Sequence, residues 1–455
     1  METHEGRFAL LTDLYELTMA AVYFERVMFE PATFSLFIRK YPGNRSYFVS
    51  AGLEDVLEYL QRLAFTDDDL EYLERAGLFK GKFLAYLENF RFSGDVRAIP
   101  EGRIFFKDEP ILEVTAPIIE AQIVETFIIN AINLQTMIAT KASRCFQSAA
   151  GRSLVDFSLR RAQGIDAGLK AARASYIAGF AGTSNVLAGK IYGIPIFGTM
   201  AHSFVASFED EIESFRAFAE VLPDNAILLI DTYDTLSGAH HAARVGAEMG
   251  ARGGTLKGVR LDSGDMTTLS RKVRKIMQDN GLDDIAIVAS GGLDEYEIAD
   301  MIRGGADINS FGVGTKMGVS ADAPYLDMAY KLVRYGRRPI MKLSTGKTTL
   351  VGEKQVFRFL ETDGKLNHDI IGLKSEDFRD SEELLLPVMN KGELVRERIS
   401  MPQIRKTFLE EFSLLDEQYK SIENSSIFPV IISPGLQQIQ ESVTKELTAK
   451  IAGEN

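Results

Sequence analysis

The middle of the chain alternates short apolar runs with helical stretches. Seven of these runs have the length of a strand, and several stop in Gly, Ser, Thr or Asp. They are LVDFSL (154–159), AGTSN (181–185), IPIFGTM (194–200), AILLIDTY (226–233), GVRLDSGD (258–265), IAIVASGGLDE (285–295) and INSFGVGTKMG (308–318). Apolar runs separated by helices are typical of βα units with a parallel sheet. The pattern predicts that these polar strand tips gather at one end of a sheet or barrel.

The two flanking regions follow other patterns. Residues 1–140 mix helices, expected near 12–27, 52–63 and 67–76, with strands at 33–40 and around DVRAIPEG and ILEVTAP. After residue 335 the alternation stops, and KQVFRFLETDGKLNHDIIG predicts a hairpin with a DG turn. We therefore predict an N-terminal α/β domain (1–140), an α/β barrel (141–335) and a C-terminal α+β segment with a helical tail (336–455).

Two further apolar segments are expected to be helical. The segment after IPIFGTM has apolar residues at spacings of three and four, which predicts one helix with a buried face. These residues are Phe204, Phe208, Ile212, Phe215 and Phe218. Polar residues interrupt the segment 117–140, so a buried helix is expected there and not a membrane span. The interruptions are Glu120, Glu125, Asn130 and Asn133.

Composition and charge narrow the choice of partners. A net charge of −13 argues against nucleic acid or an anionic membrane as the main partner, because both need a basic face. A phosphate site must then be a local basic pocket. Cys145 is the single cysteine, which excludes an internal disulfide and a CxxC zinc site. Because the N-terminus also has no signal-like pattern, we expect a cytoplasmic protein without membrane or nucleic-acid partners.

His202 is the first candidate for chemistry. It follows IPIFGTM, where a strand gives way to a helix N-terminus, and that environment favours a neutral imidazole and stabilises an attached anion. Asp231 ends the next strand, so its carboxylate is expected to hold the imidazole tautomer. The alternative is that Asp231 caps the following helix, although Asp234 suits that role equally well. The adjacent His240 and His241 are expected to be structural, because neighbouring helix positions face different directions.

Three further strand tips carry charged or small residues. Arg260 and Asp262 alternate along one strand, so both side chains point the same way and suit either an internal ion pair or an anionic ligand. Asp262 with Asp265 suits ribose hydroxyls or Mg²⁺. The glycines of ASGG and of GVGT are each consistent with an ordinary turn, but two such turns on successive terminal strands match the position where barrels bind phosphate. Arg160 follows the strand that holds Phe157, at the same end of the predicted sheet.

Taken together, these segments resemble the nicotinate phosphoribosyltransferases, a type II phosphoribosyltransferase family. The matching segments run in family order over roughly residues 8–360. They are TDLYELTMA, FSLRRAQG, AGTSNVLAG, GTMAHSF, IDTYDT, GVRLDSGD, ASGGLDE, FGVGT and KLSTGKTTLVGEKQVFR. The resemblance implies a partly open seven-stranded α/β barrel with an N-terminal α/β domain and a C-terminal α+β extension. It also implies a homodimer whose subunits share the active sites.

The resemblance further implies an activity and residue roles. The expected reaction transfers 5-phosphoribose from phosphoribosyl pyrophosphate to nicotinate, with Mg²⁺ as cofactor and ATP as co-substrate. His202 would be phosphorylated by ATP with Asp231 as its partner, and Tyr15 of the neighbouring subunit would sandwich the pyridine ring with Phe157. The other substrate-binding positions would be Thr199 and Arg260 for the carboxylate, Asp262 for ribose, Arg160 and Ser263, and Gly291, Gly292, Gly312, Gly314 and Thr315 for phosphate. No protein metal ligand is assigned.

The sequence departs from the family pattern and leaves other activities open. Val351 stands where proline is expected, close to the basic residues Lys342, Lys347 and Lys354. Nicotinamide phosphoribosyltransferase is the nearest alternative, but that relative has an acidic residue where this chain has Ser184, and a neutral residue favours the acid. A phosphosugar aldolase or isomerase would need a Schiff-base Lys or a Glu base at a strand end. A non-catalytic phosphoribosyl-ligand sensor would not need the His202 and Asp231 pair.

Overall fold

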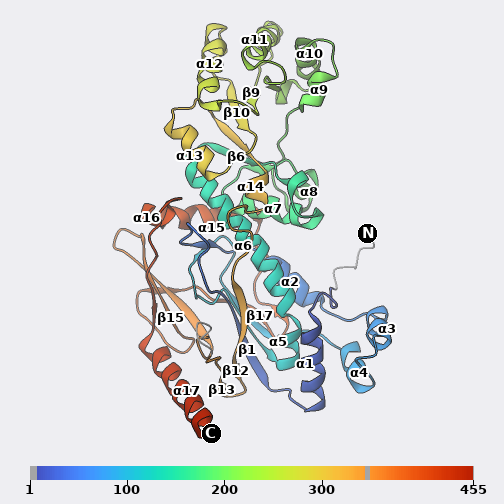
Figure 1. Ribbon diagram of the computed structural model, residues 1–455, viewed down its shortest axis with the longest axis vertical. Coiled ribbons are helices and arrows are strands. Elements are labelled where there is room, and N and C mark those ends of the chain that lie inside the picture. The colour runs from blue at the N-terminus through green and yellow to red at the C-terminus, as the bar shows by residue number, and fades with distance from the viewer. Residues whose placement is uncertain (1–7, 344–348, 454–455) are drawn as a thin grey trace. The chain divides into compact units, whose positions relative to one another are not determined.

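A parallel sheet organises residues 138–324, which form one of the two units of the chain (Figure 1). The computed structural model describes residues 8–343 and 349–453. Unit 1 comprises residues 1–137 and 325–455, and unit 2 comprises residues 138–324. The units therefore do not coincide with the three predicted regions, because the N-terminal and C-terminal segments contribute to the same unit. The three-domain division itself stays a prediction about folding domains.

Six of the seven predicted strands form the sheet of unit 2. Its order is β7 (Gly182–Thr183), β6 (Ser153–Asp156), β11 (Ser310–Val313), β10 (Ala286–Ser290), β9 (Gly258–Leu261) and β8 (Ile227–Leu229). Every neighbouring pair is parallel. Leu228, Val259, Ile287 and Phe311 are fully buried, which is expected for strands covered on both faces. This arrangement places the carboxyl ends of the six strands along one edge.

The seventh predicted strand, residues 194–200, forms a single parallel bridge between Ile196 and Thr183. Pro195 has no N–H to donate and contributes only its carbonyl, which accepts from the Thr183 amide at 3.0 Å. A seven-stranded barrel is therefore not confirmed, and the residues that the structure describes show no closed barrel. The α/β architecture with a parallel sheet is confirmed.

Helices lie before, between and after the strands of unit 2 along the chain. They are α6 (Glu125–Ser148, entering from unit 1), α7 (Ile165–Ile177), α8 (Val186–Tyr192), α9 (His202–Ala206), α10 (Glu211–Val221), α11 (Thr235–Ala251), α12 (Met266–Asp279), α13 (Glu295–Arg303) and α14 (Thr315–Gly318). Short 3₁₀ turns occupy Leu159–Arg161 and Pro223–Asn225. Aspartates cap three of these helices, with Asp234, Asp265 and Asp294 accepting from backbone amides of α11, α12 and α13.

The prediction of one long helix after residue 200 is wrong, because α9 and α10 are separate. Asp210 is extended, with φ −123° and ψ 136°, and α10 begins at the next residue with Glu211 and Glu213 in its first turn. The aromatic spacing instead reflects packing between the two helices. The Phe204 ring centroid lies 5.2 Å from that of Phe208 and 5.9 Å from that of Phe218.

Unit 1 is built on a seven-stranded antiparallel sheet. Its order is β13 (Arg338–Pro339), β12 (Met328–Tyr335), β1 (Pro31–Ile38), β5 (Leu112–Pro117), β3 (Asp95–Ala98), β17 (Leu386–Asn390) and β18 (Glu393–Leu394). Its N-terminal helices are α1 (Leu14–Glu25), α2 (Leu53–Arg62), α3 (Asp67–Arg75), α4 (Lys82–Glu88) and α5 (Ile118–Ile123). The helices and strands predicted in this region are confirmed to within a few residues.

A second sheet of unit 1 contains the predicted hairpin. Its order is β16 (Ser381–Glu383), β14 (Lys354–Leu360), β15 (Leu366–Leu373) and β19 (Val430–Ile432), and β14 pairs antiparallel with β15. A separate pair joins β2 (Phe48–Val49) to β4 (Ile104–Phe105), and the helical tail is α15 (Met401–Leu414), α16 (Glu417–Lys420) and α17 (Pro434–Gly453). The apolar segment 117–140 lies in α5 and α6, which are interrupted at Val124. Among the described residues, no helix is long and apolar enough to cross a membrane.

Candidate functional site

The loops that follow β8, β9 and β10 are joined by side-chain contacts at the carboxyl edge of the sheet. Asp231 Oδ2 accepts from the Asp262 amide at 2.9 Å and from the Ser263 hydroxyl at 2.6 Å. The hydroxyl of Ser290, the last residue of β10, donates to Asp262 Oδ1 at 2.5 Å. The structure therefore brings Asp231, Asp262 and Ser263 together, as the strand pattern predicts.

His202 is the first residue of α9, and its side chain is 44% exposed. Its Nδ1 lies 3.1 Å from Thr232 Oγ1, and its Nε2 lies 3.8 Å from Asp262 Oδ2. In the described part of the chain, no hydrogen bond or ion pair joins His202 directly to Asp231. The arrangement leaves Nε2 accessible and places Asp231 one step away, where it orients the backbone of Asp262.

Asp231 has an unused acceptor. Its Oδ1 is buried and has no hydrogen-bond partner. It does not cap α11, because Asp234 accepts from the Ser237 amide at 2.8 Å and fills that role. A buried carboxylate oxygen without a partner is costly, so a donor or a cation supplied with the substrates would stabilise it.

Arg260 lies next to this cluster and is mostly buried. Its Nη1 donates to the Thr199 hydroxyl and to the Met200 carbonyl, the latter at 3.1 Å. Its Nη2 lies 3.6 Å from Asp262 Oδ1, which supports the internal ion pair. However, its Nε is buried without a partner. Burial lowers the pKa of Arg260, but arginine remains charged, so this corner of the site retains a cation that suits an anionic ligand.

Glycine is required at the positions of the two predicted phosphate loops for different structural reasons. A Cβ at Gly291 would lie 2.1 Å from the Asp262 carbonyl oxygen, and one at Gly312 would lie 2.4 Å from the Phe157 ring. Gly314 is also close to Phe157, with a Cβ distance of 3.0 Å to its carbonyl oxygen. Gly292 has φ +69° and faces open space. Packing between loops thus explains three of these glycines, and Gly292 leaves its backbone open to a ligand.

The remaining predicted residues lie at several places. Thr315 begins α14 directly after Gly314, Arg160 lies exposed in the 3₁₀ turn after β6, and Phe157 is half-buried beside the loop after β11. Tyr15 lies on α1 in unit 1, with 46% of its side chain exposed. Lys347 lies outside the described residues.

Two other predicted groups have structural contacts. Lys354 is buried and its Nζ lies 3.2 Å from Glu113 Oε1, so this cation already has an anionic partner. His241 Nδ1 lies 2.8 Å from Glu211 Oε2, which fits the structural role expected for the histidines of α11. The described residues contain no group of three or more His, Cys, Asp or Glu side chains that could hold a metal ion.

Sequence reasoning missed three polar residues of this edge. Thr232 contacts His202, Ser290 contacts Asp262, and Asp156 is buried at the end of β6. All three lie within one residue of a predicted position. A search for polar side chains at every strand end would have found them.

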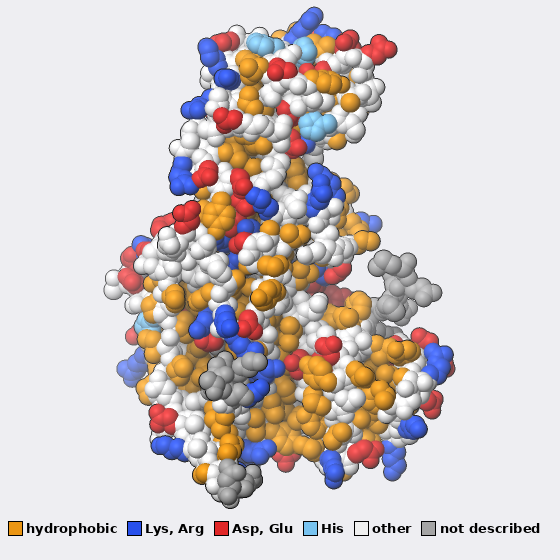
Figure 2. Space-filling model, viewed as in Figure 1, with side chains coloured by type: hydrophobic (Ala, Val, Ile, Leu, Met, Phe, Trp, Pro, Cys, Tyr) orange, Lys and Arg blue, Asp and Glu red, His pale blue; other side chains and the backbone are white. Residues whose placement is uncertain are grey.

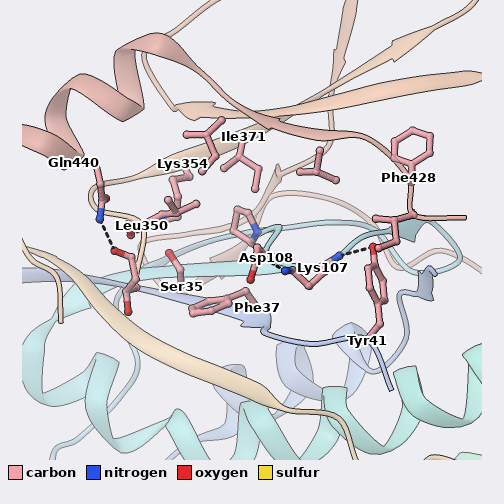
Figure 3. A pocket seen from close by; sticks show the side chains of 15 residues that line it. Ser35, Phe37, Tyr41, Lys107, Asp108, Leu350, Lys354, Ile371, Phe428 and Gln440 are labelled. Carbon is pink, nitrogen blue, oxygen red and sulfur yellow. Dashed lines mark hydrogen bonds and ion pairs between the residues drawn. The ribbon is translucent and has the colours of Figure 1, made fainter. Parts of the chain in front are cut away.

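A separate cavity of about 600 Å³ lies within unit 1, between β1 and the sheet that contains β15 (Figure 3). Its walls are mainly apolar and include Phe37, Leu350, Ile371 and Phe428. Its polar groups already contact one another. Gln440 donates to the Thr349 carbonyl at 3.2 Å, and Tyr41 accepts from the Lys107 amide at 3.1 Å. Lys354 lines this cavity, but its ammonium is paired with Glu113. The predicted catalytic and substrate-binding residues do not line it, so the strand tips of unit 2 remain the candidate site.

Comparison with known proteins gives the same family for three parts of the chain. The nicotinate phosphoribosyltransferase (NAPRTase) N-terminal domain matches residues 10–133, the NAPRTase family matches residues 152–344, and the C-terminal domain of the family matches residues 377–440. Nicotinate phosphoribosyltransferase pncB2 of Mycobacterium tuberculosis is 46% identical over 427 residues, covering 93% of this chain and 91% of the relative. The Bacillus subtilis enzyme is 38% identical over 463 residues, covering 94% of each.

Solved structures agree with the sequence comparison. Human nicotinic acid phosphoribosyltransferase superposes with a TM-score of 0.84 at 28% identity, covering 95% of this chain and 99% of the human chain. Nicotinate-nucleotide pyrophosphorylase from Pyrococcus furiosus superposes with a TM-score of 0.73 at 26% identity, covering 91% of this chain and 97% of the relative.

Proposed function

We propose that ATP hydrolysis drives the reaction of this protein through a phosphorylated His202. The premise is that the chain belongs to the nicotinate phosphoribosyltransferase family and transfers phosphoribose to nicotinate. The transfer joins the ring nitrogen of nicotinate to C1 of phosphoribosyl pyrophosphate and releases pyrophosphate. The observation that carries this proposal is the corner formed by Arg260 and His202. An unpartnered guanidinium N–H and an accessible imidazole nitrogen lie on either side of Asp262.

Arg260 is the proposed anchor for the nicotinate carboxylate. Thr199 and Met200 hold the guanidinium group of Arg260 through Nη1. The guanidinium is preorganised because the side chain is only 13% exposed. Fixing the carboxylate fixes the direction of the ring, so the ring nitrogen can be aimed at C1 of the sugar. The lone pair of that nitrogen forms the new bond to C1. The bond between C1 and the pyrophosphate oxygen breaks, and the electrons of that bond leave with pyrophosphate. Asp262, which faces both Arg260 and His202, is the proposed partner of the ribose hydroxyls.

His202 is the proposed phosphoryl acceptor. Thr232 engages Nδ1, so Nε2 is the nitrogen available to attack the γ-phosphate of ATP. An N–P bond would form as the terminal P–O bond of ATP breaks and ADP leaves. Transfer of the phosphoryl group to water would then return the free imidazole, so that atoms balance over one ATP hydrolysis.

The proposed Mg²⁺ site needs few protein ligands. Magnesium usually keeps waters and binds through one or two carboxylates together with substrate phosphates. The unpartnered Oδ1 of Asp231 fits this requirement, and Asp262 offers a second, partly exposed carboxylate. These two residues are our candidates for holding the ion, which would neutralise charge on the pyrophosphate.

We also propose a homodimer with shared active sites, and a partly open barrel completed by residues 194–200. Exposed apolar side chains support the dimer. On unit 1 they gather over α1 and α4 (Figure 2) and include Leu14, Tyr15 and Val22, each at least 46% exposed. On unit 2 a second group includes Val186 and Ile191 of α8, each at least 54% exposed. Two different apolar patches on one chain suit a head-to-tail contact.

Mixed dimers should reveal whether Tyr15 acts across subunits. Tyr15→Ala and Arg260→Ala should each lose most of their activity when present alone. Random mixing should restore about a quarter of wild-type activity, because half of the dimers contain one intact site of two. The assay measures nicotinate turnover before and after subunit exchange. Absence of complementation, or full activity of a monodisperse monomer, would contradict the shared site.

Product analysis with nicotinate and nicotinamide, each with and without ATP, tests the proposed function directly. Nicotinate should be used with at least about tenfold higher kcat/KM, because losing one charge-assisted hydrogen bond costs about 1.5–3 kcal/mol. ATP should raise the rate or lower KM for phosphoribosyl pyrophosphate. A preference for nicotinamide would support the alternative enzyme, and binding without turnover would support a sensor.

A further inference from the structure

A fully buried carboxylate lies between the loops that follow β6 and β7. Asp156 is the last residue of β6 and is 0% exposed. Its Oδ1 accepts from the Ser158 amide at 2.8 Å, and its Oδ2 accepts from the Thr183 hydroxyl at 2.7 Å. No ion pair involves Asp156 among the described residues. Burial raises its pKa above the usual range, while the hydrogen bonds from Ser158 and Thr183 oppose that shift.

The contacts of Asp156 fix the position of Ser184. The Ser184 amide donates to the Asp156 carbonyl at 2.8 Å. On its other side, the Asn185 amide donates at 2.9 Å to the same Thr183 hydroxyl that Asp156 holds. The backbone on either side of Ser184 is therefore tied to one buried residue.

The same carboxylate orders the loop that carries Phe157. Its bond to the Ser158 amide turns the chain directly after Phe157. The Phe157 amide donates to the Val313 carbonyl at 2.8 Å, and its ring packs so closely on Gly312 that a Cβ there would not fit. The loops after β6, β7 and β11 thus share Asp156 and its neighbours as a common support.

We propose that Asp156 is a positioning residue for substrate selection, which keeps Phe157 and Ser184 where the site admits a pyridine ring and prefers its acid to its amide. This inference rests on the proposed function, with Phe157 against the pyridine ring and the neutral Ser184 favouring the acid, as the family resemblance implies. Asp156 reaches the substrate only through these neighbours. A carboxylate that served stability alone would leave KM and selectivity unchanged when removed.

Two substitutions of Asp156 separate geometry from charge. Asp156→Asn keeps an acceptor for the Ser158 amide and gains an NH₂ group that can donate to Thr183 Oγ1, so its kinetics should stay within about threefold of wild type. Asp156→Ala removes the acceptor of both the Ser158 amide and the Thr183 hydroxyl. It should raise KM for nicotinate about tenfold and lower the nicotinate-to-nicotinamide ratio of kcat/KM about tenfold, with KM for phosphoribosyl pyrophosphate nearly unchanged.

Thr183→Val gives an independent variant if the alanine protein does not fold. It removes the hydroxyl that links Asp156 to Asn185 and keeps the side-chain volume, so the selectivity ratio should fall in the same direction. Ser270→Ala is the matched control. Ser270 is also 0% exposed and its hydroxyl accepts a backbone amide, that of Asp307 at 3.1 Å, in the loop before β11. Its loss should lower the melting temperature and leave KM and selectivity unchanged.

Each outcome of the comparison decides the proposal. Selective loss in Asp156→Ala or Thr183→Val, with near-normal Asp156→Asn, supports it. If the variants lose only stability, as expected of Ser270→Ala, or if Asp156→Asn fails like Asp156→Ala, the proposal is overturned. A wild-type enzyme without preference for nicotinate would instead contradict the proposed function, so the two failures are distinguishable.

Discussion

Replacement of Arg260 by alanine should lower kcat/KM for nicotinate by about tenfold to a hundredfold, because a charge-assisted hydrogen bond contributes about 1.5–3 kcal/mol. The effect should be smaller with nicotinamide, because nicotinamide has no carboxylate for Arg260 to bind. Arg260→Lys should also be impaired, since an ammonium cannot reproduce the fork that the Thr199 hydroxyl and Met200 carbonyl orient. Steady-state kinetics with both substrates measure the two ratios.

Arg303→Ala is the matched control for Arg260. Arg303 lies at the end of α13, and its ion pair with Asp300 is exposed. Exposed ion pairs of this kind contribute little, so this variant should keep normal kinetics. If Arg260→Ala lowers kcat/KM equally for nicotinate and nicotinamide, Arg260 does not bind the carboxylate.

Replacement of His202 by alanine should abolish phosphorylation by ATP and the stimulation that ATP provides. Slow ATP-independent transfer should remain, because Arg260 and the glycine loops are unchanged. Wild-type protein incubated with γ-labelled ATP should carry an acid-labile label, as expected for a phosphoramidate, and alkaline peptide mapping should place it on His202. Labelling of His202→Ala at the wild-type level would refute the role.

The neighbours of His202 refine this experiment. Thr232→Val removes the hydroxyl 3.1 Å from Nδ1 and should reduce the labelling rate, since the imidazole loses the group that orients it. Asp231→Asn should reduce labelling too, by disturbing the backbone of Asp262 and the hydroxyl of Ser263. His240→Ala is the control, because His240 is an exposed residue of α11 and should leave the label intact.

The strands and helices were predictable from the sequence where burial alone determines which positions are apolar. Strands such as β9 and β10 are covered on both faces, so their apolar runs mark them clearly. The separation of α9 from α10 was not predictable from apolar spacing, because Phe204 and Phe218 contact each other across two helices. A periodic pattern shows which residues are buried together and does not show whether one helix carries them all.

The candidate site was predictable in its location and less so in its contacts. Parallel strands bring their carboxyl ends to one edge, and this places His202, Asp231 and Asp262 in one region. Which side chain reaches His202 depends on the direction of each loop residue. Adjacent residues point different ways, so Thr232 contacts the imidazole while Asp231 turns toward the loop after β9. A one-residue difference of this kind depends on tertiary packing.

The pairing of β1 has a consequence for biosynthesis. One edge of β1 pairs with β5, at residues 112–117 and so before unit 2 in the chain, and the other pairs with β12, at residues 328–335. The whole of unit 2 is translated between these partners, and its sheet uses strands from residues 138–324 alone. Unit 2 can therefore complete its hydrogen bonding on the ribosome while β1 still has an open edge, which is a template for aggregation. A nascent chain that stalls before β12 would carry a complete parallel sheet together with an unprotected antiparallel one.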